Sequence, residues 1–547
     1  MALTRTASEP RRRVDFANPM AFWVGSTAVV VGVLFHVPMF VGARDSGYRL
    51  VGMPLSGLMI LGMALIVGGF VGVYFGLAPK VAHRASESHV QVKAFDDAPL
   101  RPAHYRLMAV LLIAIAVDTL KPFTFVFIIP GATAEYGLSS PGHLLAGHWP
   151  IALYPLSGIT GTAIGSFLWG YLGDRIGRRA SVLFGAIIFI GTSICGFMVA
   201  YGWNLVMCFV MGLGVGGLLP IAYSLLTETI PARNRGTIVV LVAGVGTALG
   251  FLLASNAADW LIPHYTWRIM WFLGMPTGVL LILLNRWIPE SPRFLLANGR
   301  DDEARECMAE FGVEVVESSE LSEEAVIGHE LLGRGFTTVF RPPFGAITLA
   351  LILYGLGWGL VNFGFITWLP AKLAAEGLAT THVTSILAHA ALFAVPGSVL
   401  VAWLYGRWSA KWTMALVAGV SAVVLLLFAT EAHRLASNQT LLTVLIVALL
   451  VPLWGVVSVL APYAAEVYPT AVRATGSGVA AGASKIGGVI ALGMSAAAIA
   501  PPGIPGAAFL TGVPMALAAV AVALVGIETR GKSLETISLQ ELEFEPT

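Results

Sequence analysis

Two ionisable residues stand three positions apart in an apolar stretch, and their types and spacing could move a proton or hold an ion. Asp118 and Lys121 lie within the run 106–131, where a helix would place both side chains on one face. A charge inside the membrane costs about 3 kcal/mol or more unless it is paired or hydrated, and such charges usually mark a substrate or proton path. We interpret Asp118 as the proton-coupling group and Lys121 as a substrate-binding cation beside it. The alternative is a static ion pair that fixes helix packing.

Another lysine lies inside a later apolar run. Lys485 stands between Gly482 and the pair Gly487-Gly488 in the run 474–500. Its ammonium group could bind the carboxylate of a substrate or a carboxylate from another helix. The alternative is a lysine near a helix end whose side chain reaches the membrane interface. We interpret Lys485 as a substrate-binding residue.

The composition defines the surroundings of these charges. Of the 547 residues, 57% are hydrophobic and 12% are charged, and the mean hydropathy is +0.81. Soluble globular chains carry about 25% charged residues, so the composition excludes a soluble enzyme and indicates a multi-span membrane protein. Three cysteines cannot build a disulfide framework or a four-ligand zinc site. No set of nucleophile and base stands out, and we expect no enzymatic activity, no cofactor and no metal.

The membrane-spanning helices follow from the lengths of the apolar runs. A helix needs about 20 apolar residues to cross the hydrocarbon of a bilayer. By that criterion the sequence predicts fourteen spans and an all-α membrane protein. The runs cover residues 20–42, 51–77, 106–131, 149–173, 180–202, 203–228, 236–259, 267–288, 343–370, 383–406, 412–430, 440–465, 474–500 and 505–527.

The basic residues between the runs predict the orientation, because cytoplasmic connections carry an excess of lysine and arginine. With the N-terminus in the cytoplasm, 25 of the 32 lysines and arginines fall on the cytoplasmic side and only five fall outside. An even number of spans then places both termini in the cytoplasm. We expect a multi-pass protein of the cytoplasmic (plasma) membrane.

Polar segments divide the spans into groups, and the longest one after the first hundred residues separates six spans from six. Its stretch Asp301–Phe311 favours a short surface helix. We expect seven segments in order along the chain. They are a cytoplasmic tail (1–19), two extra spans (20–77), a cytoplasmic linker (78–105), a six-helix bundle (106–288), a cytoplasmic loop (289–342), a second six-helix bundle (343–527) and a cytoplasmic tail (528–547).

The two six-span groups repeat one another. The segment from Glu228 to Arg235 recurs from Glu466 to Arg473 with the pattern Glu-x-x-Pro-x-x-x-Arg. Further matches appear in the same order at nearly the same offset, among them Glu290 with Glu528. A parallel duplication of this kind implies a pseudo-two-fold axis along the membrane normal, and it suits a transporter whose halves rock about a site near the midplane.

These motifs resemble those of the major facilitator superfamily, specifically its sugar-porter and metabolite:proton symporter branches. The segment Gly170–Arg179 is similar to the superfamily's signature gating loop, and Pro289–Arg293 and Glu528–Glu535 are similar to two sugar-porter signatures. The resemblance implies a twelve-helix core of two pseudo-symmetric six-helix bundles. The two extra N-terminal helices are a departure from the common arrangement.

The resemblance also implies which residues gate the transporter. Ionic contacts at the cytoplasmic helix ends would hold one conformation and break in the other. The alternative is that these residues only set the topology. A departure is Gly406, which stands where the second copy of the gating loop would carry an aspartate. The implied gating residues are Asp174, Arg175, Arg178, Arg179, Glu228, Arg235, Glu290, Arg293, Glu466 and Arg473.

In the superfamily the first, fourth, seventh and tenth core helices line the central cavity, so the resemblance implies further substrate contacts. The alternative for any aromatic residue there is packing or anchoring at the interface. The implied substrate residues are Tyr223, Tyr354, Trp358 and Asn362.

The cargo follows from the balance of polar groups. Asn362 is the only amide in the run 343–370, and a hexose would need several such groups. A cationic, aromatic-lined cavity suits a small organic anion, either an aromatic or a short-chain carboxylate, taken up with protons. The alternatives are a proton-coupled sugar or polyol porter, a proton-driven drug or metabolite exporter, and a non-transporting sensor or scaffold.

We expect the partners to be this small molecule, protons and the bilayer, with no nucleic acid. A monomer should suffice for transport. The two extra helices are a candidate dimer contact.

Overall fold

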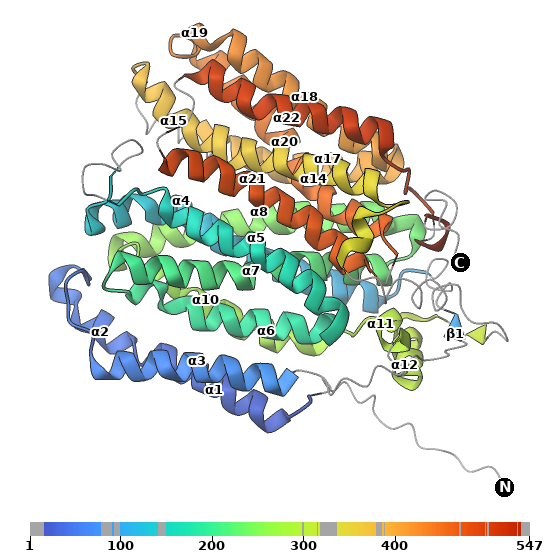
Figure 1. Cartoon of the computed structure of the whole chain (residues 1–547), viewed down its shortest axis with the longest axis horizontal. Coiled ribbons are helices and arrows are strands. Elements are labelled where there is room, and N and C mark those ends of the chain that lie inside the picture. Colours follow the sequence, from blue (N-terminus) through green and yellow to red (C-terminus); the bar gives the residue numbers. More distant parts are fainter. Residues whose placement is uncertain are drawn as a thin grey trace.

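The computed structural model describes a protein built almost wholly of helices. Long helices lie side by side, and α12 and the two short strands lie beyond one end of them, which we call the α12 end (Figure 1). The described residues are 16–77, 90–91, 99–139, 149–297, 300–313, 316–317, 336–378, 386–387, 389–469, 472–497, 499, 503–532 and 534–537.

Among the described residues, twelve helical stretches are long and apolar enough to cross a membrane. Two of the fourteen expected spans are not among them. α5 (Leu153–Ile176) has sufficient length, but it is rich in glycine, serine and threonine. α17 (Ala394–Arg407) has only 14 residues within the described part of the run 383–406. The fold is therefore an all-helical membrane protein with twelve candidate spans.

The first two spans form a hairpin at one edge of the molecule, drawn in blue in Figure 1. They pack closely because glycines face each other: a Cβ on Gly25 would lie 2.7 Å from the Gly69 carbonyl oxygen, and one on Gly62 would lie 2.7 Å from the Gly32 oxygen. One side of the hairpin packs against α6, where Phe22, Val29, Ile66 and Val73 are buried. Its elements are α1 (Pro19–Leu34), α2 (Val37–Gly42), η1 (Arg44–Ser46) and α3 (Gly57–Leu77).

The next helices share one hydrophobic core, whose buried residues lie between Ala103 and Val313 except for Ala461. α4 runs unbroken for 35 residues although it contains Pro122 and Pro130. Membrane helices tolerate such prolines because neighbouring helices and polar side chains satisfy the freed carbonyls. The elements are α4 (Pro102–Tyr136), α5, α6 (Arg178–Gly191), η4 (Thr192–Phe197), α7 (Tyr201–Thr229), α8 (Ala232–Tyr265), α9 (Ile269–Phe272), α10 (Gly274–Leu284) and η5 (Asn285–Trp287).

A second core joins the helices after residue 336. The helix that begins with α14 passes through a π-helical turn, η7, before it continues as α15. Such turns interrupt the regular hydrogen-bond pattern and are frequent at functional sites. The elements are η6 (Phe336–Phe340), α14 (Gly345–Leu360), η7 (Val361–Phe365), α15 (Ile366–Ala375), η8 (Ala391–Phe393), α17, α18 (Ala410–Thr430), α19 (Ala432–Leu435), α20 (Gln439–Val467), α21 (Arg473–Ala496), α22 (Ile504–Val525) and α23 (Leu534–Thr536).

The long polar segment between the two cores carries the predicted surface helix, α12 (Asp301–Phe311), and α11 (Pro292–Ala297) before it. This expectation is confirmed with the predicted bounds. A short antiparallel pair follows, in which β2 (Val316–Glu317) joins β1 (Val90–Gln91). The segment between the cores is thus tied to the linker that precedes α4.

The two cores meet along two helix pairs that the sequence repeat relates to each other. α5 packs against α21, and α17 packs against α8. At the first pair the backbones touch, because a Cβ on Gly170 would lie 2.8 Å from the Ala474 carbonyl oxygen. The repeat is therefore visible in the packing as well as in the sequence.

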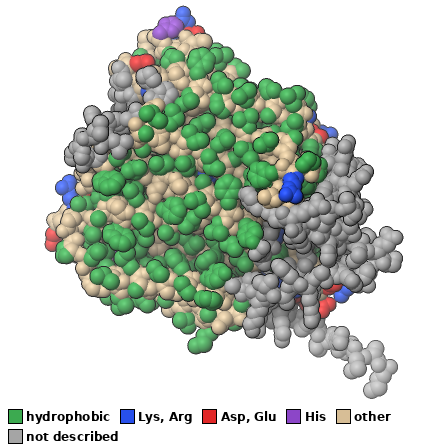
Figure 2. Space-filling view, viewed as in Figure 1, with side chains coloured by type: hydrophobic (Ala, Val, Ile, Leu, Met, Phe, Trp, Pro, Cys, Tyr) green, Lys and Arg blue, Asp and Glu red, His purple; other side chains and the backbone are tan. Residues whose placement is uncertain are grey.

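Apolar side chains cover the face shown in Figure 2, and charged groups gather toward its ends. Large apolar side chains are exposed on the surface of the protein, among them Trp260 (70%), Leu283 (60%) and Leu524 (75%). A water-soluble protein rarely exposes apolar surface on this scale, so the face is suited to contact with lipid.

Candidate functional site

Asp118 lies in the middle of α4 and is wholly buried. Neither of its carboxylate oxygens has a hydrogen-bond partner among the described residues. Buried polar groups are nearly always paired, so an unpartnered carboxyl inside a membrane protein calls for a proton or a ligand. Two side chains from other helices interact with it electrostatically, Tyr223 of α7 and Lys485 of α21.

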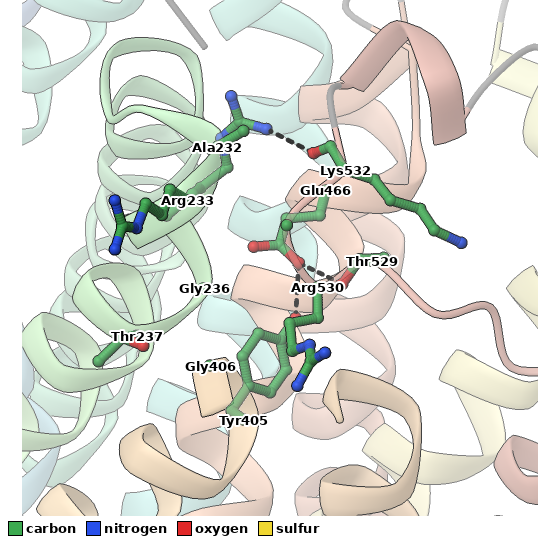
Figure 3. A pocket seen from close by; sticks show the side chains of 12 residues that line it. Ala232, Arg233, Gly236, Thr237, Tyr405, Gly406, Glu466, Thr529, Arg530 and Lys532 are labelled. Carbon is green, nitrogen blue, oxygen red and sulfur yellow. Dashed lines mark hydrogen bonds between the residues drawn. The ribbon is translucent and has the colours of Figure 1, made fainter. Parts of the chain in front are cut away.

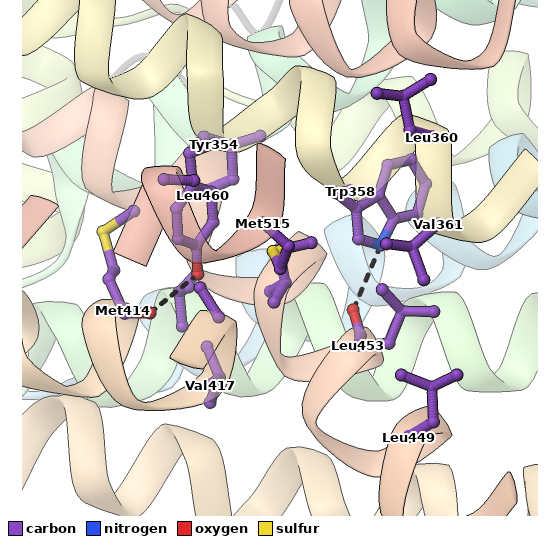
Figure 4. Close-up of a cluster of buried hydrophobic side chains, with 14 of the residues drawn as sticks. Tyr354, Trp358, Leu360, Val361, Met414, Val417, Leu449, Leu453, Leu460 and Met515 are labelled. Atoms are coloured by element: carbon purple, nitrogen blue, oxygen red, sulfur yellow. Dashed lines mark hydrogen bonds between the residues drawn. The ribbon is translucent and has the colours of Figure 1, made fainter. Parts of the chain in front are cut away.

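Lys485 comes from the second core and faces Asp118 across the junction of the two cores. Its ammonium group lies 5.1 Å from the centre of the Trp358 ring, within range of a cation–π interaction. The Trp358 indole N–H donates to the Leu453 carbonyl oxygen at 3.1 Å, which fixes the ring (Figure 4). The lysine is therefore held by an aromatic face, and no ion pair involving it occurs within 4 Å in the described part of the chain.

Lys121 is placed away from Asp118. Its ammonium donates to the Trp271 carbonyl oxygen at 3.2 Å and lies 5.8 Å from the centre of the Trp271 ring. Gly274 makes room for it, because a Cβ at that position would collide with the ammonium. Although the two residues are one helical turn apart, the long lysine side chain turns into the first core. The structure does not bring Lys121 to the junction where Asp118 and Lys485 meet.

Aromatic rings line the junction beside these charges. Phe123 of α4 stacks on Trp454 of α20, with ring centres 5.9 Å apart and planes 6° from parallel. Phe251 of α8 contacts both rings edge-on, at 5.3 and 6.2 Å. The stack joins the two cores one to two turns along α4 from Asp118. Phe123 and Phe251 were not among the expected site residues. The signal that the sequence offered for Phe123 was its match to Phe363 in the repeat, at an offset of 240 residues.

The other expected substrate residues lie in different places. Tyr354 is wholly buried in the second core, where its hydroxyl donates to the Met414 carbonyl oxygen at 3.2 Å (Figure 4). Asn362 lies in the π-helical turn η7 and is half-buried. Tyr354 thus has the contacts of a packing residue, whereas Asn362 is placed where the helix is irregular.

At the α12 end, a buried carboxylate joins the two cores. Glu228 of α7 accepts from Arg178 of α6 and from Arg473 of α21, each at 3.1 Å, and all three side chains are nearly inaccessible to solvent. Charge-assisted bonds of this kind are about twice as strong as neutral ones. Arg473 belongs to the second copy of the repeat, so this contact crosses the junction.

The second copy of the motif makes a related contact. Glu466 accepts from the Tyr405 hydroxyl at 2.8 Å and the Thr529 hydroxyl at 2.6 Å, and it interacts electrostatically with Arg235 of the first core. These groups border a small hollow at the α12 end (Figure 3). Each glutamate of the repeat therefore faces the arginine from the other copy.

Two further glutamates related by the repeat cap helices. Glu290 accepts from the backbone N–H groups of Arg178 and Arg179, at 2.8 and 3.2 Å, at the start of α6. Glu528 accepts from the Ala410 N–H at 3.0 Å at the start of α18. Carboxylates at helix N-termini interact favourably with the helix dipole. Burial raises the pKa of Glu290, while the Arg178 guanidinium and the amide bonds oppose that rise.

The side chains of three expected gating residues, Asp174, Arg175 and Arg293, lie outside the described part of the structure. The described expected gating residues gather at the α12 end around the two glutamates of the repeat and the two capping glutamates.

At the opposite end, the structure contains an ion pair that was not expected. The Arg268 guanidinium contacts Glu135 at 2.7 Å, and the Trp267 indole N–H donates to the same carboxylate at 2.9 Å. The backbone N–H of Leu50 also donates to Glu135, at 2.9 Å. The connection between the first two spans is thereby bonded to the first core.

Residues 107–492 match the sequence pattern of the Major Facilitator Superfamily. The chain belongs to this superfamily. It is a secondary transporter and not an enzyme, as the sequence predicted.

Two curated relatives and one solved structure place the chain within the superfamily. It is 27% identical to the niacin transporter NiaP of Acinetobacter baylyi, over 82% of this chain and 99% of NiaP. It is 28% identical to the 4-hydroxybenzoate transporter PcaK of Pseudomonas putida, over 80% of this chain and 96% of PcaK. The proton:xylose symporter XylE has the same fold, with a TM-score of 0.67 at 18% identity over 80% of this chain and 98% of XylE.

Proposed function

We propose that the protein takes up a small organic anion, an aromatic or short-chain carboxylate, together with protons. The observation that carries the proposal is the buried, unpartnered carboxyl of Asp118 opposite the Lys485 ammonium at the junction of the two cores. In a transporter that works by alternating access, the substrate site lies near the midplane at this junction.

Coupling follows from the charges of these two groups. When Asp118 is ionised, it balances the charge of Lys485 and the site attracts no anion. A proton on Asp118 leaves the Lys485 charge uncompensated, and the substrate carboxylate can then bind beside it. Because the proton favours the anion, the anion favours the proton to the same extent. An inward proton gradient would therefore drive uptake.

The aromatic walls favour a substrate that carries a ring. Trp358 lies beside Lys485, and the stacked rings of Phe123 and Trp454 lie near Asp118. Aromatic rings attract one another in offset or edge-on arrangements worth about 1 kcal/mol beyond the buried area. The names of the relatives NiaP and PcaK point to niacin and 4-hydroxybenzoate, which are aromatic carboxylates, and this supports the proposal.

We also propose that the contacts at the α12 end form the cytoplasmic gate. The bond between Glu228 and Arg473, and the electrostatic contact between Glu466 and Arg235, must break when the halves part on that side. The caps by Glu290 and Glu528 lie within single halves and can remain intact. Asp174, Arg175 and Arg293 would act in the same gate.

We propose that the chain crosses the plasma membrane fourteen times and that both termini lie in the cytoplasm. This topology requires that α5 and α17 also cross. α5 is about 36 Å long at 1.5 Å per residue, and it packs against α7 and α21 within the bundle. α17 packs against α8 in the related position. We propose that a monomer carries out transport, because both cores that enclose the site are parts of one duplicated chain.

The test is transport by the purified protein in liposomes. With an inward proton gradient we expect accumulation of an aromatic carboxylate such as 4-hydroxybenzoate, and none of xylose. Asp118→Asn should exchange substrate across the membrane but lose gradient-driven accumulation. Asp259→Asn is the matched control and should accumulate the substrate normally. Asp259 is exposed and lies on α8 near the helix end that is far from α12. Full accumulation by Asp118→Asn would refute the role of Asp118 in proton coupling. Accumulation of sugars alone would refute the proposal that the substrate is an organic anion.

A further inference from the structure

A basic cavity lies at the α12 end, where α4, α6 and η5 meet α12. Its volume is about 40 Å³, and its lining includes Arg106, Arg179, Arg286, Trp287 and Glu310. A single water needs about 10–15 Å³ on this measure, so the cavity has room for a larger polar group. It is separate from the junction of the two cores, because all of its lining comes from the first core and α12.

Arginines outnumber acidic residues in the lining of the cavity. The lining contains Arg106, Arg179 and Arg286 and one glutamate, Glu310, which pairs with Arg106. Arg286 is exposed and stacks over the Trp287 ring at 3.9 Å, and it makes no hydrogen bond or ion pair within the described residues. Arg286 therefore offers the cavity a positive charge and planar guanidinium donors, which match a phosphate group.

An exposed apolar stripe leads from the lipid-facing surface to this cavity. The span Ile269–Trp287 ends at the cavity, and Val279, Leu283 and Arg286 follow each other at the spacing of one helix face. Val279 and Leu283 are 37% and 60% exposed. A hydrocarbon chain that lies along α10 would thus end beside the guanidinium donors of Arg286.

We propose that this cavity binds the phosphate of an anionic phospholipid. The headgroup phosphate would lie between Arg286 and Arg106, with an acyl chain along Val279 and Leu283. Basic pockets between membrane helices bind anionic headgroups in this way, whereas a soluble phosphate would gain nothing from the apolar stripe.

The site has a structural consequence for α12. This helix contacts α4 through the Phe311 ring, which lies 4.8 Å from the His104 ring, and through the Arg106–Glu310 ion pair. A phosphate shared by Arg106 and Arg286 would join the start of α4 to η5 within the cavity that α12 also lines. The lipid would therefore hold α12 on the first core.

The test is lipid binding by the full chain, measured by native mass spectrometry after delipidation. We expect phosphatidylglycerol to remain bound at energies that remove phosphatidylcholine. Arg106→Gln combined with Arg286→Gln should lower phosphatidylglycerol occupancy at least tenfold. Arg305→Gln, on the exposed face of α12 and outside the lining, is the matched control and should retain the lipid. If the double variant does not fold, the phosphatidylglycerol occupancy of Arg286→Gln alone is compared with that of the wild type.

Three outcomes would overturn the proposal. One is equal phosphatidylglycerol occupancy in the double variant and the wild type. The second is retention of phosphatidylcholine as firmly as phosphatidylglycerol. The third is that inorganic phosphate raises the melting temperature in detergent in an Arg286-dependent manner while phosphatidylglycerol does not bind, since the cavity would then hold a soluble anion.

Discussion

Three charged side chains lie within the membrane-spanning region near the middle of their helices, and the fold gives each a different environment. Asp118 is buried without a hydrogen-bond partner among the described residues. Lys485 lies over the face of Trp358 at the junction of the cores. Lys121 donates to a backbone carbonyl inside the first core. Residues of the same type, Lys121 and Lys485, are therefore expected to respond differently to substitution.

Replacing Lys485 should weaken substrate binding. A hydrogen bond to a charged group is worth about 1.5–3 kcal/mol, so Lys485→Gln should raise the Kd of the carboxylate roughly 10- to 150-fold. Binding of radiolabelled substrate to the purified protein measures this. Lys372→Gln, on α15 toward the end opposite α12, is the control and should leave the Kd unchanged. An unchanged Kd in Lys485→Gln would remove this residue from the substrate site.

Replacing Lys121 should leave substrate binding intact. The side chain of methionine is similar in volume, and removing a buried charge that lacks a carboxylate partner is often neutral or stabilising. We therefore expect Lys121→Met to keep the substrate Kd within about twofold and to melt at or above the wild-type temperature. Measurements of the substrate Kd and of the melting temperature of this variant and the wild type test the expectation. A tenfold loss of affinity would return Lys121 to the substrate site.

At the level of elements, glycines determine how closely helices approach. In the N-terminal hairpin, Gly25 on α1 faces Gly69 on α3 so closely that a side chain at either position would meet the opposite backbone. The hairpin is also bonded to the first core, since Leu50 donates to Glu135. The hairpin therefore contacts the first core through both of its helices and through the connection between them.

A larger residue in that contact should destabilise the hairpin. Gly25→Leu places a side chain against the backbone of α3, and overpacking of this kind costs about 1–3 kcal/mol. We expect a lower melting temperature in a fixed detergent. Gly68→Leu is the matched control, because a Cβ there meets no atom within 4 Å. Equal melting temperatures for the two variants would show that the hairpin is not held by this contact.

At the level of the whole molecule, the two halves are joined at one end by charges and near the middle by stacked rings. Glu228 bonds to Arg473 at the α12 end, and Phe123 stacks on Trp454 farther along. Opening of the α12 side must break the contact between Glu228 and Arg473. The strength of this contact therefore biases which side of the protein is open at rest.

Removing the Glu228 charge should open the α12 side. Glu228→Gln weakens the charge-assisted bond to Arg473 of the other half, which shifts the equilibrium toward the state in which that bond is broken. In a Cys307→Ser background, a cysteine at Ser477, which is buried in α21, should react with maleimide at least tenfold faster in this variant. Glu376→Gln, exposed beyond α15, is the control. Equal labelling rates would exclude Glu228 from the gate.

The sequence determined those features that depend on local composition and on the repeat. Runs of apolar residues identified the twelve candidate spans, and the pattern of Asp301–Phe311 predicted α12. The duplicated Glu-x-x-Pro-x-x-x-Arg motif indicated two related halves. These features follow from the sequence because hydropathy, helix periodicity and duplication are properties of residues near one another in the chain.

Only the tertiary structure decided which side chains meet. It pairs Glu228 with the arginine of the other copy, Arg473, and it places Lys485 rather than Lys121 at the junction with Asp118. The reason is geometric: a helix turn sets the face on which a residue lies, but the packing of distant helices sets what that face meets. For this transporter the sequence therefore determined the charges in the membrane, and the fold decided which of them share a site.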